Sequence, residues 1–265
     1  MQIGSADAIF ESPEIEIMAS NTRERAGKSK DIIREDGKTF FEFTDRVTAF
    51  DGLKEDEYLH KGEVCCRMSV YWFEIMGQEG IPTHFRSFVP PNRIEVTYLE
   101  IIPIEVICRN YVAGSLLQRY GRGEEPGAGI EPRLGARIPD GIIEFTTKFE
   151  ERDRPIGEEE ILGNGWLTRE ELDQIREYTR RVNEIMSGHL LEKGIILADF
   201  KIEFGKNAAG EILLADEVGT PDGCRFWVRD SYDAGRIESL DKDVYRYDEG
   251  DVSDAYSRIQ KRICG

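Results

Sequence analysis

Residues 197–217 read LADFKIEFGKNAAGEILLADE, a pattern that predicts two β-strands joined by a turn. Charged and apolar side chains alternate in the first half, and successive side chains of a strand point to opposite faces. Asp199, Lys201 and Glu203 therefore share one face, while the apolar side chains between them anchor the strand in a core. The second strand ends at Asp216, which pairing as a hairpin would return to the charged face.

The charged face of this hairpin has two interpretations. Half-polar strands are common at the solvated edge of a sheet, and the pattern by itself is compatible with that. Carboxylates on a rigid ribbon also suit Mg²⁺, which takes one or two protein oxygens and completes its coordination with phosphate and water. The second strand ends in the acidic pair Asp216 and Glu217. Pro221, Asp222 and Arg225 follow directly after this pair, and they favour the magnesium site.

The composition of the chain limits the classes of partner. Its 265 residues include 52 acidic and 35 basic side chains, a formal net charge of −17. Nucleic acid and anionic membranes need a positive surface, so we expect neither as a partner. No apolar run approaches the ~20 residues of a membrane span, and no signal pattern opens the chain, so we expect a cytoplasmic protein. The five cysteines form no C-x-x-C pair and predict neither a zinc site nor a disulfide framework.

Hydrophobic periodicity predicts further elements around the hairpin. One helix is expected over residues 63–78, and a second begins at a capping box over residues 168–171 and runs to residue 193. A closing helix is expected after Val252, and the Gly- and Pro-rich residues 120–141 are typical of a long functional loop. The other predicted strands include residues 38–43, 83–89, 94–99 and 104–108.

Two short motifs place basic side chains where phosphate could bind. Lys28 and Lys30 flank a serine after Gly27, and such a loop can cover phosphates, although an ordinary basic turn has the same composition. The strand that ends at Arg109 runs into Ala-Gly and Ser115, which could direct a guanidinium and a hydroxyl at a phosphate. An arginine paired with a surface acid is the alternative there.

Two long motifs and five shorter ones occur together in this chain. The long ones are IIPIEVICRNYVAGS at residues 101–115 and LADFKIEFG at residues 197–205. The short ones are GKSKDII (27–33), FTDRVTAFDG (43–52), TTKFEERD (146–153), DEVGTPDGCRFW (216–227) and SLDKDVYR (239–246). In this order they resemble the SAICAR synthetase family, the phosphoribosylaminoimidazole-succinocarboxamide synthases.

The resemblance implies a ligase of de novo purine biosynthesis. Such an enzyme uses ATP and Mg²⁺ to join L-aspartate to the carboxylate of CAIR (carboxyaminoimidazole ribotide), and releases SAICAR, ADP and phosphate. A carboxylate is a poor electrophile, so the family's reaction implies an acyl-phosphate intermediate that the aspartate amine attacks. Every participant is anionic, so a chain of charge −17 has to gather basic side chains in one cleft. A homo-oligomer, a dimer or a trimer, is also implied.

The resemblance also implies a role for individual residues. Glu203 and Asp216 correspond to the metal ligands, and Lys201 and Asp199 to catalytic residues on the same strand face. The implied ATP-binding residues are Lys28, Lys30, Glu105 and Lys148. The implied substrate-binding residues are Arg109, Ser115, Asp153, Asp222, Arg225, Lys242 and Arg246.

The fold implied is α+β, with two lobes of mostly antiparallel sheet and helices, related to the lobes of ATP-grasp enzymes and protein kinases. Residues 1–106 would form the ATP-binding lobe, with an extension over residues 1–26, and residues 107–265 the lobe with the metal and substrate site. Two alternatives are a phosphotransferase with another acceptor and an inactive nucleotide-binding protein. The second would be expected to lack a metal carboxylate or Lys201, and the chain has them all.

Overall fold

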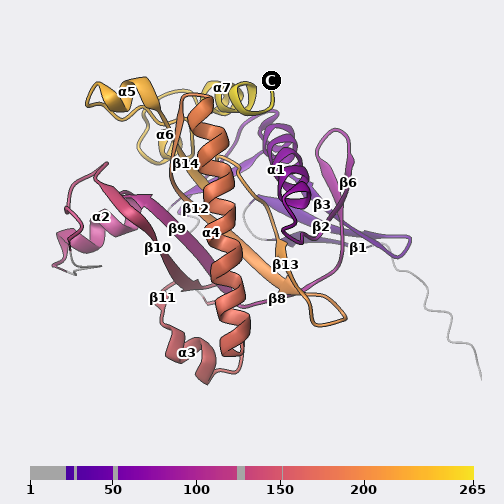
Figure 1. Ribbon diagram of the computed structural model, residues 1–265. Helices are drawn as coiled ribbons and strands as arrows, with labels where there is room; N and C mark the ends of the chain where they lie inside the picture. Colours follow the sequence, from indigo (N-terminus) through magenta and orange to yellow (C-terminus); the bar gives the residue numbers. More distant parts are fainter. Residues whose placement is uncertain (1–21, 27–28, 50–52, 124–128, 151) are drawn as a thin grey trace, which may run out of the picture.

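A computed structural model of the chain describes residues 22–26, 29–49, 53–123, 129–150 and 152–265. These residues form a five-stranded sheet, a seven-stranded sheet and a two-stranded ribbon, with helices packed around them (Figure 1). Every strand pair is antiparallel. Lys28 and most of the predicted N-terminal extension lie outside the described residues.

The five-stranded sheet belongs to the first part of the chain. Its strands, in spatial order, are β1 (Thr22–Ala26), β2 (Lys30–Glu35), β3 (Lys38–Phe43), β7 (Arg93–Val96) and β6 (Phe85–Val89). Helix α1 (Lys61–Gln78) contacts β3, β6 and β7, and starts two residues before its predicted beginning. The ribbon of β4 (Arg46–Ala49) and β5 (Lys54–Glu57) precedes this helix.

The seven-stranded sheet is built around β12 (Ile195–Lys206), the first strand of the predicted hairpin. One edge of β12 pairs with β9 (Ile104–Tyr111) and then with β8 (Glu100–Ile101), while the other pairs with β14 (Cys224–Val228) and then with β13 (Ile212–Ala215). The predicted hairpin is thus confirmed. Strands β10 (Arg137–Thr147) and β11 (Pro155–Ile156) extend the sheet beyond β9.

Gly205 shows how closely the backbones approach along β12. A Cβ atom at this position would lie 2.8 Å from the Leu99 Cβ and 3.0 Å from the Glu100 carbonyl oxygen. Carbon atoms normally stay about 3.5–4.0 Å apart, so a side chain here would separate β8 from β12. The glycine therefore allows the two strands to pair.

Helices cover both parts of the molecule. Helix α4 (Arg169–Glu192) crosses the seven-stranded sheet and contacts β12 and β9 (Figure 1). Its predicted capping box is confirmed: the Thr168 hydroxyl accepts from the Glu171 N–H at 3.2 Å, and the Thr168 N–H donates to the Glu171 carboxylate at 2.8 Å. The closing helix α7 (Val252–Cys264) packs on α1. The shorter helices are α2 (Gly114–Gly121), α3 (Glu158–Gly163), α5 (Arg229–Asp233) and α6 (Asp243–Arg246).

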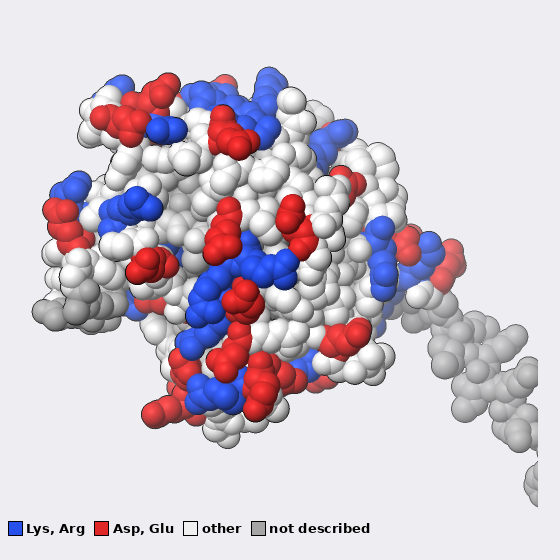
Figure 2. Space-filling view, in the orientation of Figure 1, with Lys and Arg blue, Asp and Glu red and all other residues white. Residues whose placement is uncertain are grey.

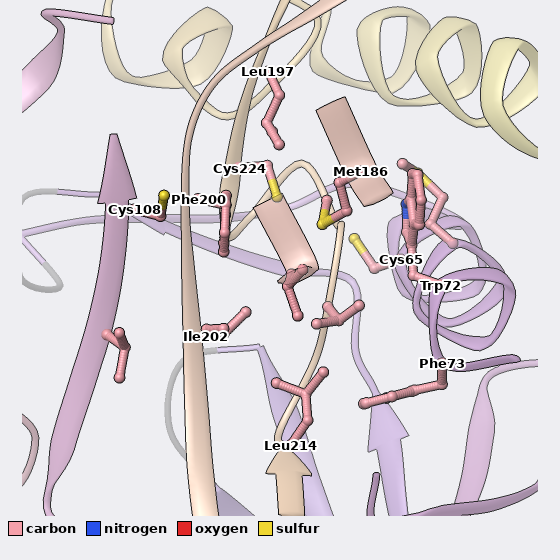
Figure 3. Close-up of a cluster of buried hydrophobic side chains, with 14 of the residues drawn as sticks. Cys65, Trp72, Phe73, Cys108, Met186, Leu197, Phe200, Ile202, Leu214 and Cys224 are labelled. Carbon is pink, nitrogen blue, oxygen red and sulfur yellow. The ribbon is translucent and has the colours of Figure 1, made fainter. Parts of the chain in front are cut away.

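The apolar face of β12 forms the centre of the core. Figure 3 shows Phe200 and Ile202 of this strand in one cluster with Met186 of α4 and with Trp72 and Phe73 of α1. One continuous cluster of buried apolar side chains therefore joins the first part of the chain to the second. The predicted lobe boundary at residue 106 falls inside β9, and the division into two lobes stays a prediction.

The prediction of a long loop over residues 120–141 is partly wrong. Strand β10 begins at Arg137, and its pairing with β9 is irregular between Arg137 and Ile142. Gly141 adopts a φ of 64° in this irregular segment, a conformation that costs glycine little. The composition indicated a loop because glycine and proline also mark bulges within strands. In the part of the chain that the structure describes, no helix is long and apolar enough to cross a membrane.

Candidate active site

The charged face of β12 is largely covered by other parts of the chain. Asp199 and Glu203 are 4% and 3% exposed, whereas the Lys201 side chain between them keeps 40% of its surface. Glu203 pairs in register with Ala215 of β13, so Asp216 lies one residue beyond the paired segment. Buried carboxylates need ionic or hydrogen-bonding partners, and neighbouring elements supply them.

One group of partners surrounds Glu203 and Asp216. The Lys30 Nζ of β2 lies 3.2 Å from the Asp216 Oδ2 and 2.6 Å from the Glu217 Oε1. The Lys148 Nζ, just after β10, lies 2.5 Å from the Glu203 Oε2. We call this group the acid–lysine cluster; its members are Lys30, Glu105, Lys148, Lys201, Glu203, Asp216 and Glu217.

Glu105 and Lys201 complete the cluster from adjacent strands. The Lys201 ammonium forms an ion pair with the Glu105 carboxylate, and its Nζ lies 3.9 Å from the Glu203 Oε1. The Thr146 hydroxyl donates to Glu105 at 2.9 Å. Glu105 was predicted to bind ATP, and the structure brings it directly to the predicted catalytic lysine.

The electrostatics of Glu203 and Asp216 suit a cation. Burial raises the pKa of Glu203, and the nearby Asp216 carboxylate raises it further. Burial also acts to raise the pKa of Asp216, but Lys30, Lys148 and Lys201 outweigh it and lower that pKa to about 2. A buried carboxylate and a half-buried one that repel one another are a donor set that fits Mg²⁺.

The described ranges contain no group of three or more His, Cys, Asp or Glu side chains arranged to hold a metal ion. A fully protein-coordinated metal site is therefore not formed there. Mg²⁺ in nucleotide enzymes commonly takes one or two carboxylates and receives its other ligands from phosphate and water. The pair of carboxylates is compatible with that second type of site.

A second group of charges meets at Asp199. Arg109 of β9 and Arg225 of β14 are both register partners of Asp199, one on each edge of β12. Their Nη1 atoms lie 3.3 and 2.8 Å from the same Asp199 Oδ2. The Ser115 hydroxyl, at the start of α2, accepts from the Arg109 Nη2 at 2.9 Å. We call Arg109, Arg225, Asp199 and Ser115 the arginine cluster.

Acidic side chains outside the arginine cluster also accept hydrogen bonds from its two arginines. The Arg109 Nε donates to Glu144 at 2.6 Å, and the Arg225 Nε donates to Asp243 at 2.7 Å. Arg246 also pairs with Asp243 at 2.5 Å. Burial acts to lower the pKa of Arg225, but Asp199 and Asp243 outweigh it, so the group stays fully charged.

Gly114 allows Arg225 to approach α2. Its φ is 50°, and a Cβ atom there would lie 2.4 Å from the Arg225 Nη2. Any other residue would therefore push the guanidinium away from the start of the helix. A cavity of about 970 Å³ opens beside this contact, with Trp227, Tyr232 and Asp243 among its lining residues. This volume is within the range of small-molecule sites.

Asp222 belongs to neither cluster. Its carboxylate is buried, forms an ion pair with Lys61 and accepts from the Tyr256 hydroxyl at 3.0 Å. The Lys242 Nζ lies 3.8 Å from it. Burial lowers the pKa of Lys242 to about 8, and the charges of Arg246 and Lys61 add to this effect while Asp222 opposes it.

The structure therefore brings together most of the predicted site residues. Asp153 lies exposed between β10 and β11, and Lys28 lies outside the described residues. The sequence reasoning missed Glu217, Glu144 and Asp243 as partners of the predicted bases. Glu217 and Asp243 lie inside quoted motifs, so their position there was the available signal, whereas Glu144 had none.

The outer face of α4 has a different character, because basic and acidic side chains interleave there (Figure 2). The Arg169 Nη1, for example, lies 2.6 Å from the Glu158 Oε2 of α3. Exposed pairs of this kind contribute about 0–1 kcal/mol to stability. Buried bases such as Lys30 and Arg109 are instead gathered around β12.

Lysines and arginines held over carboxylates on an antiparallel sheet are typical of enzymes that handle anionic, phosphate-bearing small molecules. The model of the family described as SAICAR synthetase matches residues 24–263, and the chain belongs to this family. It is a ligase that forms the amide bond of SAICAR, and it has a role in purine biosynthesis. The predicted family and the predicted α+β fold are confirmed.

Individual relatives match over most of their length. The phosphoribosylaminoimidazole-succinocarboxamide synthase of Pyrococcus abyssi is 41% identical over 243 residues, which cover 90% of this chain and 96% of the relative. A solved SAICAR synthetase (Type-2) in complex with ADP is 40% identical, with a TM-score of 0.81 over 90% of this chain and 96% of that one. The Ehrlichia chaffeensis synthase structure is 31% identical, with a TM-score of 0.83 over 91% and 98% of the two chains.

Proposed function

We propose that the chain uses ATP to join L-aspartate to the carboxylate of CAIR through an acyl phosphate, and releases SAICAR, ADP and phosphate. One observation carries the proposal: β12 holds the acid–lysine cluster and the arginine cluster side by side, with Asp199 and Lys201 two residues apart. A reaction between a nucleoside triphosphate and a phosphorylated carboxylic acid requires two adjacent clusters of anion-binding side chains.

The acid–lysine cluster is the proposed nucleotide side. A relative of 40% identity was solved in complex with ADP, which supports the use of ATP by this chain. Lys30 and Lys148 would contact the phosphates, together with Lys28, and Glu105 would help to position the nucleotide. Glu203 and Asp216 would hold Mg²⁺, which when bound supplies positive charge to the phosphate oxygens.

The arginine cluster is the proposed CAIR side. Arginine offers a planar fork of N–H donors that fits phosphate, and Ser115 adds a hydroxyl. Asp199 fixes both guanidinium groups because each bonds to the same carboxylate oxygen. Lys242, Arg246, Asp222 and Asp153 would complete the substrate-binding region, either in contact with the remaining carboxylates or by holding the residues that make this contact.

Lys201, in the acid–lysine cluster, is assigned to the transfer step itself. A carboxylate oxygen of CAIR attacks the γ-phosphorus, the bond to the ADP oxygen breaks, and an acyl phosphate forms. The aspartate amine then attacks the acyl carbon, loses a proton, and phosphate leaves with its bonding electrons. The Lys201 ammonium would contact the γ-phosphate or the CAIR carboxylate, and its charge would lower the cost of that transfer.

The test is ADP release by the purified protein with ATP and Mg²⁺, with CAIR and L-aspartate added separately and together. We expect full turnover to require both, and mass spectrometry to identify the coupled amide. Release that neither compound affects would refute the proposal and indicate another acceptor. The absence of release from a folded protein in every mixture would refute it as well.

A further inference from the structure

Strand β12 changes the side on which it faces the core between Leu197 and Phe200. Both side chains belong to one core cluster, although they lie three positions apart and a regular strand would point them to opposite faces (Figure 3). Ala198 packs in a separate apolar cluster, and Asp199 next to it contacts Arg225. Two successive residues of the strand therefore point away from the core.

The cause is a β-bulge in β12 against β14. Leu197 is the register partner of Phe226, whereas Asp199 is the partner of Arg225, so Ala198 is one extra residue on β12. An uninterrupted register would place Ala198 opposite Arg225 and would turn Asp199 into the core. Bulges of this kind redirect side chains. This one decides that the Asp199 carboxylate meets the arginine cluster.

The Asn110 amide holds the carbonyl group just before the extra residue. Its Nδ2 donates to the Leu197 carbonyl oxygen at 3.1 Å and to the Asn183 Oδ1 of α4 at 2.7 Å. The Asn183 Nδ2 donates back to the Asn110 Oδ1 at 2.9 Å, so the two amides form a reciprocal pair. A carbonyl oxygen can only accept, so the Leu197 carbonyl fixes which atom of the Asn110 amide faces it. One side chain thus connects the bulge to α4.

Asn110 lies at the point where the regular pairing of β9 stops. Arg109 is the last residue of β9 in register with β12, and its partner there is Asp199. On the other edge of β9, the pairing with β10 is irregular between the partners of Arg109 and Tyr111. Backbone groups inside a fold need hydrogen-bond partners, and side chains supply them where strands do not pair regularly. The Asn110 amide does so next to the residue that binds Asp199.

We propose that Asn110 is a positioning residue: its amide holds the bulge of β12 at the Leu197 carbonyl and so keeps Asp199 on the face of the arginine cluster. The consequence for the substrate rests on the proposed function, in which the arginines of this cluster bind CAIR. The consequences for the backbone and for the charge balance of the cluster do not depend on it.

Two matched variants separate this bond from the amide pair. Asn110→Asp and Asn183→Asp each replace one amide of the pair by a carboxylate. Only Asn110→Asp removes the donor to the Leu197 carbonyl, because Asn183 supplies an acceptor to the Asn110 Nδ2 and aspartate keeps that acceptor. Asn110→Leu removes the same donor without adding a charge. Hydrogen exchange over residues 195–200 is compared with exchange over residues 203–206 of the same strand.

We expect at least tenfold faster exchange over residues 195–200 in Asn110→Asp and Asn110→Leu, and less than twofold faster exchange in Asn183→Asp. Exchange over residues 203–206 should stay unchanged, because this segment pairs in register with β13. Equal acceleration in Asn110→Asp and Asn183→Asp would overturn the proposal, since disruption of the amide pair would then explain it. Wild-type exchange in Asn110→Leu would overturn it too.

A double variant measures the link to Asp199. If Asn110 acts by holding this carboxylate at the arginines, the losses of the two side chains are not additive. We expect Asn110→Leu to lower the Tm of the Asp199→Asn variant by at most half as much as it lowers the Tm of the wild type. An equal fall in both backgrounds would show that Asn110 stabilises the chain without positioning Asp199.

Steady-state kinetics test the consequence for the substrate. Asn110→Leu should raise the KM for CAIR about tenfold and leave the KM for ATP within twofold, because the acid–lysine cluster lies beyond the bulge. An unchanged KM for CAIR, or an equal rise for both substrates, would refute the positioning of the CAIR site. If the wild type does not turn over CAIR, the proposed function fails, while hydrogen exchange and the double variant still decide the role of Asn110.

Discussion

Replacement of Asp199 by asparagine tests whether this carboxylate neutralises the arginine cluster. The Arg109 and Arg225 Nη1 atoms contact the same Asp199 oxygen, so they lie at most about 6 Å apart. Two unit charges at that separation repel by about 3 kcal/mol at an effective dielectric constant of about 20. Glu144 and Asp243 remain as partners, and we expect a loss of roughly 2–4 kcal/mol rather than the larger cost of an isolated buried charge.

Thermal unfolding followed by circular dichroism measures this loss. For a chain of this size the expected fall in Tm is roughly 6–12 °C. Asp233→Asn is the matched control, because Asp233 pairs with Arg229 at 3.5 Å on the surface and the pair should contribute under about 1 kcal/mol. If the two variants lose the same stability, Asp199 does not carry the charge balance of the cluster.

Three further predictions concern turnover. Lys201→Ala should abolish turnover without a change in the circular dichroism spectrum, and near wild-type turnover would refute the role given to this face of β12. Arg225→Ala should raise the KM for CAIR at least tenfold, and an unchanged KM would place Arg225 outside the CAIR site. The Lys242 ammonium has a pKa of about 8 and is charged below it, so kcat/KM for the substrate it binds should fall as the pH rises through 8. Lys242→Arg should remove that limb of the profile, because arginine stays charged; a limb that persists would assign it to another group.

Local features of the chain were predictable because their causes are local. The alternation along β12 follows from the opposite orientation of successive side chains, and the capping box at Thr168 from hydrogen bonds between residues three apart. The prediction of a loop over residues 120–141 was partly wrong because it also rested on local signals alone. Glycine and proline show where the backbone deviates, but they do not show whether a neighbouring strand such as β9 pairs with it.

The charge balance of the site was not predictable in this way. Asp222 belongs to the same sequence motif as Arg225. Its carboxylate nevertheless contacts Lys61 and Tyr256 in a buried network. Glu144 carries no signal in the sequence, because its relation to Arg109 depends on the register of β10 with β9, in which Ile142 is the partner of Arg109. His84 looked like a scattered histidine until the fold joined its backbone N–H to the Leu214 carbonyl of β13, two residues before Asp216.

The alternation of residue types and the order of the motifs were enough to predict which face of β12 is charged, which residue types could bind phosphate and metal, and which family the chain resembles. These follow from covalent geometry and from the order of its motifs. Tertiary structure alone decided that Arg109 and Arg225 meet at one oxygen of Asp199, and that Lys30 reaches Asp216 across 186 positions of sequence. The physical reason is that strand register and the burial of distant segments are set by the packing of the whole core, which no local pattern contains.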